Sequence, residues 1–228
     1  MIAFRSTLFN FLFVGWTVFL LSSLWLLMPL SRQIFRQAVA LWPYGTFPLM
    51  QHILELTFEE RGLENLPNEP VIFASKHQST WDTMYFLWLN RDTAYVMKEE
   101  LNRIPFWKWY MNKCQHIVVD RVGGPSAMRK MISDTKEILN KGRSVVIFPE
   151  GTRTPPGESQ RYHPGVAALY SQTNATIIPV ALNSGCFWGR RHYLKKPGTL
   201  TIEFLPPIAK NLDRKAFLEE LELRIESA

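Results

Sequence analysis

Only two of the 228 residues are cysteines, Cys114 and Cys186. Two cysteines cannot form the disulfide framework of a small secreted domain or a four-cysteine zinc site, and they indicate a reducing compartment. The histidines are scattered and lack the spacing of a zinc-binding motif, so the sequence predicts no metal centre. It also contains no internal repeat and no low-complexity tract, which argues against repeat architectures and disordered chains.

Acidic residues are missing from the first 50 residues, which carry only Arg5, Arg32 and Arg36 as charged side chains. The rest of the chain holds all 20 acidic residues. This uneven distribution predicts an apolar, membrane-attached segment at residues 1–55 and a charged domain at residues 56–228. A domain of that length can bury a hydrophobic core of its own.

The longest uncharged run lies between Arg5 and Arg32. Residues 6–28 are rich in Leu, Phe, Val and Trp, and a helix of that length would span about 35 Å, against a hydrocarbon core of about 30 Å. We therefore expect a membrane-embedded helix that ends at Pro29. A cleaved signal peptide and a buried core helix are the alternatives, but no clear cleavage site follows Pro29 and no polar face marks a globular helix.

A second apolar segment, residues 37–54, contains no formal charge. Pro43, Gly45 and Pro48 are expected to break it, which predicts a segment lying in the membrane interface rather than a second span. An apolar linker packed on the main domain is the alternative. Because Arg32 and Arg36 follow the first helix, the positive-inside rule places the main domain on the cytoplasmic side of an inner (cytoplasmic) membrane.

The main domain alternates between short β-branched runs and helical patterns. Strands are predicted at residues 71–74, 94–97, 116–119, 144–148, 176–182 and 200–205. Helical periodicity is clearest in residues 126–140 and 213–226. The sequence therefore predicts an α/β fold with a mostly parallel mixed sheet flanked by helices, preceded by the membrane-embedded helix and the interfacial segment. Ligand sites in such sheets lie beyond the carboxyl ends of the strands.

The first candidate site follows the strand at residues 71–74. His77 and Asp82 are five positions apart and would lie about 140° apart on one continuous helix. Ser79 and Asp82 have the spacing of a capping box, which would begin a helix between them and let the two side chains meet. Asp82 would then orient His77 as a general base acting on a hydroxyl of the substrate. A helix-capping Asp82 and a structural His77 are the alternatives.

The second candidate site, Phe148–Arg153, follows the strand at residues 144–148. Gly151 permits a tight turn, and Thr152 offers a hydroxyl. Arg153 carries the planar fork that suits phosphate oxygens. Glu150 would hold either Arg153 or the loop in place. The alternative is a strand-ending turn with a surface ion pair.

Together these motifs resemble the 1-acylglycerol-3-phosphate acyltransferase family of glycerolipid acyltransferases. The family's His-x4-Asp motif matches His77 and Asp82, and its Phe-Pro-Glu-Gly-Thr-Arg motif matches residues 148–153 without a change. Residues 98–106, 118–121 and 178–181 resemble further family blocks, in the family's order.

The resemblance implies transfer of an acyl group from an acyl-CoA or acyl carrier protein thioester to the free hydroxyl of a lysophospholipid, without a cofactor. The expected acceptor is 1-acylglycerol-3-phosphate and the expected product is phosphatidic acid. His77 would be the base and Asp82 its orienting partner. The residues implied in binding the substrate are Lys98, Arg121, Glu150, Gly151, Thr152 and Arg153.

Three alternatives stay open: another lysolipid acceptor, a membrane-bound thioester hydrolase, and a non-catalytic membrane-binding module. Residues 187–196 mix aromatic and basic side chains, which suits anionic lipid headgroups and also RNA. Since the N-terminal helix already indicates a lipid bilayer, we expect the membrane and no nucleic acid as partner.

Overall fold

The computed structural model describes residues 1–89, 92–104, 106–120 and 122–228. Within them, one mixed sheet has the strand order β1-β7-β6-β2-β5-β3-β4. Neighbouring strands are parallel except β6 and β7, which are antiparallel. The bounds are β1 Leu56–Arg61, β2 Val71–Ser75, β3 Thr93–Lys98, β4 Ile117–Val119, β5 Ser144–Ile147, β6 Thr176–Leu182 and β7 Gly198–Phe204. The mostly parallel mixed sheet predicted from the sequence is confirmed.

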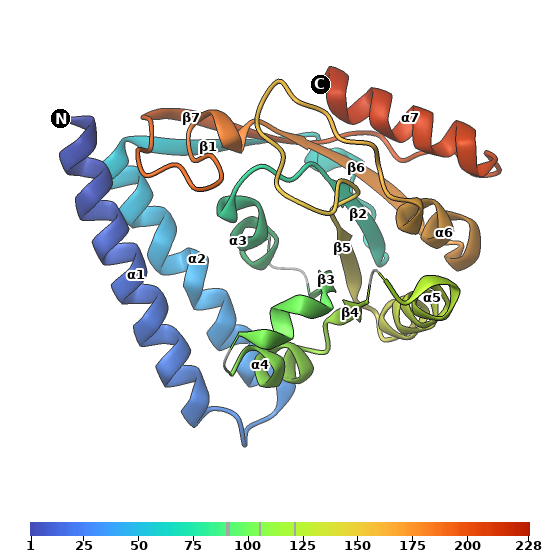
Figure 1. Cartoon of the computed structure of the whole chain (residues 1–228), viewed down its shortest axis with the longest axis horizontal. Coiled ribbons are helices and arrows are strands. Elements are labelled where there is room, and N and C mark those ends of the chain that lie inside the picture. The colour runs from blue at the N-terminus through green and yellow to red at the C-terminus, as the bar shows by residue number, and fades with distance from the viewer. Residues whose placement is uncertain (90–91, 105, 121) are drawn as a thin grey trace.

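Helices cover both faces of the sheet (Figure 1). The helices are α1 Ile2–Leu26, α2 Arg32–Leu54, α3 Thr80–Trp88, α4 Trp107–Cys114, α5 Gly124–Asn140, α6 Pro164–Thr173 and α7 Arg214–Ser227, with short 3-10 turns η1 Leu63–Asn65, η2 Glu99–Arg103 and η3 Ser184–Cys186. Phe73 of β2 packs with α1, α2 and α3, whereas its neighbours Ile72 and Ala74 pack with α5, α6 and α7. Both faces of the central strand are therefore buried, as expected for a nearly continuous apolar strand.

The first helix, α1, begins at Ile2 rather than at residue 6 and ends at Leu26 rather than at Pro29. Arg5 lies within it and pairs with Glu55 at 2.5 Å. Among the described residues, α1 is the one helix long and apolar enough to cross a membrane. Only 17% of its most apolar window is buried, and Phe4, Phe11 and Phe19 are among its exposed side chains. Such exposure is unusual for a core helix.

The prediction that Pro43, Gly45 and Pro48 break the second apolar segment is wrong. Pro43 and Pro48 lie inside the continuous helix α2. Each proline costs a helix interior roughly 3 kcal/mol, so packing must compensate. Gly45 lies against the Trp16 ring of α1, and Trp16 Nε1 donates a hydrogen bond to the Trp42 carbonyl at 3.1 Å. The two helices run side by side in opposite directions (Figure 1). α2 ends at Leu54 and β1 begins at Leu56.

Strand β1 was absent from the sequence prediction. Its sequence, Leu56–Arg61, contains three charged residues, and three of its residues are only partly buried. It lies at the edge of the sheet and pairs with β7 alone among the described strands. An edge strand of this composition does not show the apolar run by which the other six were found.

Candidate active site

Three loops meet at the carboxyl ends of β6, β2 and β5, which are neighbours in the sheet. Lys76 N donates to the Val180 carbonyl at 2.9 Å, which joins the β2 loop to β6. Thr154 N donates to the His77 carbonyl at 2.8 Å, which joins the β5 loop to the β2 loop. The two candidate sites from the sequence therefore form one site, at the sheet edge where parallel strands place their ligands.

His77 lies in the β2 loop, and Asp82 lies in the first turn of α3. Ser79 caps that helix, and the capping box with Asp82 is present. Asp82 Oδ2 lies 3.0 Å from His77 Nδ1 and also accepts hydrogen bonds from the backbone N of Gln78 and Ser79, at 2.6 and 2.8 Å. Asp82 is completely buried. The same Asp82 oxygen therefore accepts the capping hydrogen bonds and contacts the imidazole. Asp82 can cap α3 and orient His77 at the same time.

The other carboxylate oxygen of Asp82 is bound by a residue that the sequence analysis missed. Ser184 Oγ, at the start of η3, donates to Asp82 Oδ1 at 2.5 Å. Ser184 is fully buried. It follows β6 at the same edge of the sheet as His77, and that placement is the signal by which it could have been found.

Phe148 fixes the face of the His77 ring. The two rings stack with centroids 3.9 Å apart and planes inclined by 18°. The His77 side chain is 14% exposed. With Nδ1 on Asp82 and one face on Phe148, the ring nitrogen that remains to meet a substrate is Nε2.

Arg153 lies beside this pair. Its Nη1 donates to Thr80 Oγ1, in the first turn of α3, at 2.9 Å. Gly151 precedes it with a φ of +68°, a conformation that glycine adopts without strain. Burial lowers the pKa of the Arg153 guanidinium, and the nearby Asp82 carboxylate opposes that shift. The guanidinium thus shares the site with the imidazole, as the sequence prediction required.

Glu150 holds the loop through Lys76 rather than through Arg153. The Lys76 ammonium lies 3.0 Å from Glu150 Oε1 and 2.6 Å from Glu226 Oε1 of α7. Tyr162 OH donates to the same Glu226 oxygen at 3.1 Å. Burial raises the pKa of Glu150, and Lys76 opposes the shift. Glu150 is 1% exposed, and its partner, Lys76, ties the loop to α7.

Two other predicted binding residues lie outside these contacts. Lys98 ends β3, the parallel neighbour of β5 in the sheet. Arg121 lies outside the described residues. Thr152 lies between Gly151 and Arg153 in the β5 loop, and its Oγ1 accepts a hydrogen bond from Arg190 Nη1 at 3.2 Å.

Comparison with known proteins decides the family. The acyltransferase family model matches residues 57–183, which include both candidate motifs. The chain belongs to the acyltransferase family. A relative from Pseudomonas aeruginosa, named 1-acyl-sn-glycerol-3-phosphate acyltransferase, is 32% identical over 86% of this chain and 76% of its own length.

A second sequence relative has the same name, and a solved structure shares the fold. A 1-acyl-sn-glycerol-3-phosphate acyltransferase from Limnanthes alba is 27% identical over 75% of this chain, and the match covers 57% of its own length. The crystal structure of the LPA acyltransferase PlsC from Thermotoga maritima shares the fold, with a TM-score of 0.75 at 21% identity. That match covers 100% of this chain and 95% of PlsC.

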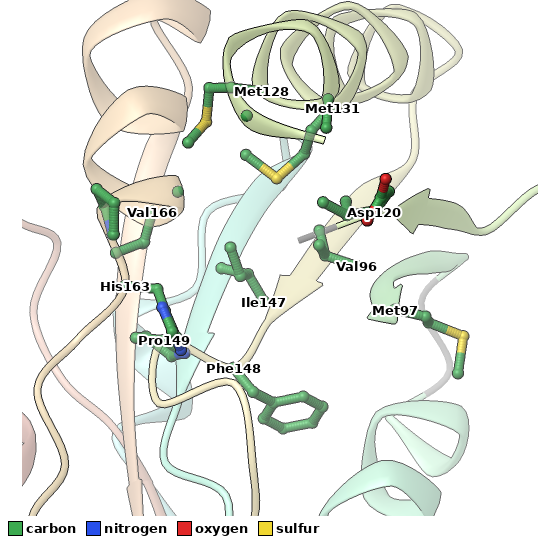
Figure 2. A pocket seen from close by; sticks show the side chains of 15 residues that line it. Val96, Met97, Asp120, Met128, Met131, Ile147, Phe148, Pro149, His163 and Val166 are labelled. Atoms are coloured by element: carbon green, nitrogen blue, oxygen red, sulfur yellow. The ribbon is translucent and has the colours of Figure 1, made fainter. Parts of the chain in front are cut away.

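The candidate site adjoins a cavity of about 200 Å³ (Figure 2). Phe148, whose ring stacks on His77, also lines this cavity. Figure 2 shows Met128 and Met131 of α5 on one wall and Ile147 of β5 on another. His163 and Asp120 are the titratable groups among its lining residues. A largely apolar cavity therefore borders the aromatic ring that supports the imidazole.

Proposed function

We propose that this acyltransferase moves an acyl group from a thioester donor to the free hydroxyl of 1-acylglycerol-3-phosphate, forming phosphatidic acid. The observation that carries the proposal is the His77–Asp82 contact of 3.0 Å on the same pair of loops as Arg153. The names of the relatives from Pseudomonas aeruginosa and Limnanthes alba support the choice of acceptor.

In this proposal His77 is the general base. Its Nε2 removes the proton of the acceptor hydroxyl while that oxygen attacks the thioester carbonyl carbon. The carbon–sulfur bond then breaks, and the leaving sulfur takes the proton from Nε2, which gives an ester and a free thiol. Asp82 keeps the Nδ1 proton in place and stabilises the charged imidazole during the transfer.

Arg153 would bind the phosphate of the acceptor. A guanidinium pairs with phosphate through two parallel hydrogen bonds, and one fork nitrogen, Nη1, is already oriented by Thr80. Thr152 and the turn at Gly151 shape the loop that presents it. The donor would be acyl-CoA or acyl carrier protein, and no further cofactor takes part in the proposed reaction.

The exposed apolar surface of α1 would attach the enzyme to a bilayer, where its lipid acceptor lies. Arg32 and Arg36, after α1, would keep the catalytic domain on the cytoplasmic side. The cavity beside Phe148 would take up part of an acyl chain, since most of its lining side chains are apolar. Enlarging it at Met131 with alanine should then shift the preference toward longer acyl chains.

In the test, membranes that contain the protein are incubated with each member of a panel of lysolipids. The donor is one labelled acyl group attached to either CoA or acyl carrier protein. We expect labelled phosphatidic acid from 1-acylglycerol-3-phosphate and loss of turnover by at least about 100-fold in His77→Ala. Transfer to a different lysolipid would show that 1-acylglycerol-3-phosphate is not the acceptor. Release of free acid without transfer would favour a hydrolase. Near-normal transfer by His77→Ala would refute the mechanism.

A further inference from the structure

We infer that Arg190 is a second cation that binds the phosphate monoester of the acceptor, together with Arg153. This inference rests on the proposed function. Arg190 lies in the long connection between η3 and β7, outside both motifs that identify the site. Its Nη1 donates to Thr152 Oγ1 at 3.2 Å and to the Arg153 carbonyl at 3.4 Å.

The two arginines have complementary positions on the loop. Arg153 turns inward, where Thr80 binds one of its terminal nitrogens. Arg190 is exposed and contacts a hydroxyl and a backbone carbonyl of the same loop. In the described part of the chain, its hydrogen bonds use Nη1, so Nε and Nη2 of the fork can meet a ligand. Phosphate oxygens are the usual partners of such a fork.

Positive charge is in excess at this place. After burial and the opposing effect of Asp82, the charges of Arg190 and Arg191 also lower the pKa of Arg153, so the three guanidiniums act on one another. Asp82 is already committed to His77, Ser184 and two backbone N–H groups. A dianionic phosphate monoester between Arg153 and Arg190 would offset this mutual repulsion.

The segment that carries Arg190 is firmly supported. Trp188 is buried, and its ring meets Phe9 of α1 edge to face with centroids 5.1 Å apart. Farther along, Lys195 N donates to Ser6 Oγ at 2.9 Å, and the hydroxyls of Tyr193 and Thr7 are 2.7 Å apart. Figure 1 shows this connection beside the N-terminal end of α1. Arg190 is thus held between two points, which reduces the entropy that a bound phosphate must overcome.

The test compares Arg190→Gln, Arg190→Lys and the remote exposed control Arg214→Gln with the wild type, using lysophosphatidic acid and acyl-CoA at varied concentrations. Loss of a charge-assisted hydrogen bond should raise the KM for lysophosphatidic acid roughly 10- to 100-fold in Arg190→Gln. Arg190→Lys, which keeps the charge without the fork, should show a smaller rise. The KM for acyl-CoA and the melting temperature should stay at wild-type values, and Arg214→Gln should match the wild type throughout.

Two outcomes would overturn the inference. A rise in the KM for acyl-CoA instead would assign Arg190 to the phosphates of the donor. A lower kcat with both KM values unchanged would show that Arg190 only supports the conformation of the Thr152 loop. Absence of any transfer to lysophosphatidic acid by the wild type would instead refute the proposed function, which separates the two failures.

Discussion

Replacing Asp82 with asparagine tests the centre of the proposed mechanism, because the change removes a buried charge and keeps the shape. At the 3.0 Å between His77 Nδ1 and Asp82 Oδ2, the attraction between imidazolium and carboxylate is about 5 kcal/mol at an effective dielectric constant of 20. A neutral hydrogen bond of about 1 kcal/mol would survive in the variant. The difference of about 4 kcal/mol predicts a kcat roughly 1,000-fold lower.

The assay measures transfer of a labelled acyl group at saturating substrates, beside thermal unfolding of the same preparation. Ser184→Ala is the matched control, since it removes the 2.5 Å hydrogen bond to Oδ1 and leaves the carboxylate charge in place. Its kcat should fall by no more than about 10-fold, the worth of one hydrogen bond. If Asp82→Asn folds and keeps kcat within 10-fold of the wild type, the carboxylate does not stabilise a charged His77 and the reasoning fails.

Three further outcomes follow from other parts of the molecule. Burial lowers the pKa of His116 to about 3, so its contribution to stability is present above the unfolded pKa of about 6.5 and is lost as pH falls toward 3. Urea unfolding in detergent should therefore show the wild type losing up to about 2 kcal/mol more than His116→Gln between pH 7 and pH 5, and parallel losses would contradict this. Glu226→Gln should weaken the hold on Lys76 and lower kcat several-fold without changing either KM, and an unchanged kcat would show that α7 does not support the site. Gly45→Ala should lower the melting temperature, because its Cβ would overlap the Trp16 ring, whereas Gly15→Ala, with open space around its Cβ, serves as the control.

Local patterns in the sequence were sufficient for much of the fold. The six predicted strands all occur. Three of them, β2, β5 and β6, are almost entirely buried, and β7 alternates between buried and less buried residues. The capping box placed the start of α3 between His77 and Asp82, and the structure confirms that boundary. The prolines of α2 misled the prediction, since their local cost is visible in the sequence whereas the packing of Gly45 on Trp16 is not.

Contacts between distant residues account for what the sequence could not supply at the site. Lys76 and Glu226 are 150 positions apart, and Asp82 and Ser184 are 102 apart. Asp82 and Ser184 meet because β2 and β6 end side by side in the sheet, and Lys76 meets Glu226 because α7 packs against β6. Glu150 was predicted to hold Arg153 or its loop, and only the partner, Lys76, decides between these. Residue type and spacing alone do not identify such a partner.

The position of the His77 ring also sets the order of events in the proposed reaction. With one nitrogen committed to Asp82 and one face covered by Phe148, a proton accepted at Nε2 has to depart from that same atom. In the proposed reaction the acceptor oxygen attacks the thioester carbonyl directly, so the incoming alcohol and the departing sulfur meet this nitrogen in a single encounter. Steady-state kinetics should accordingly give intersecting double-reciprocal lines, the pattern of a ternary complex, and not the parallel lines of an acylated enzyme.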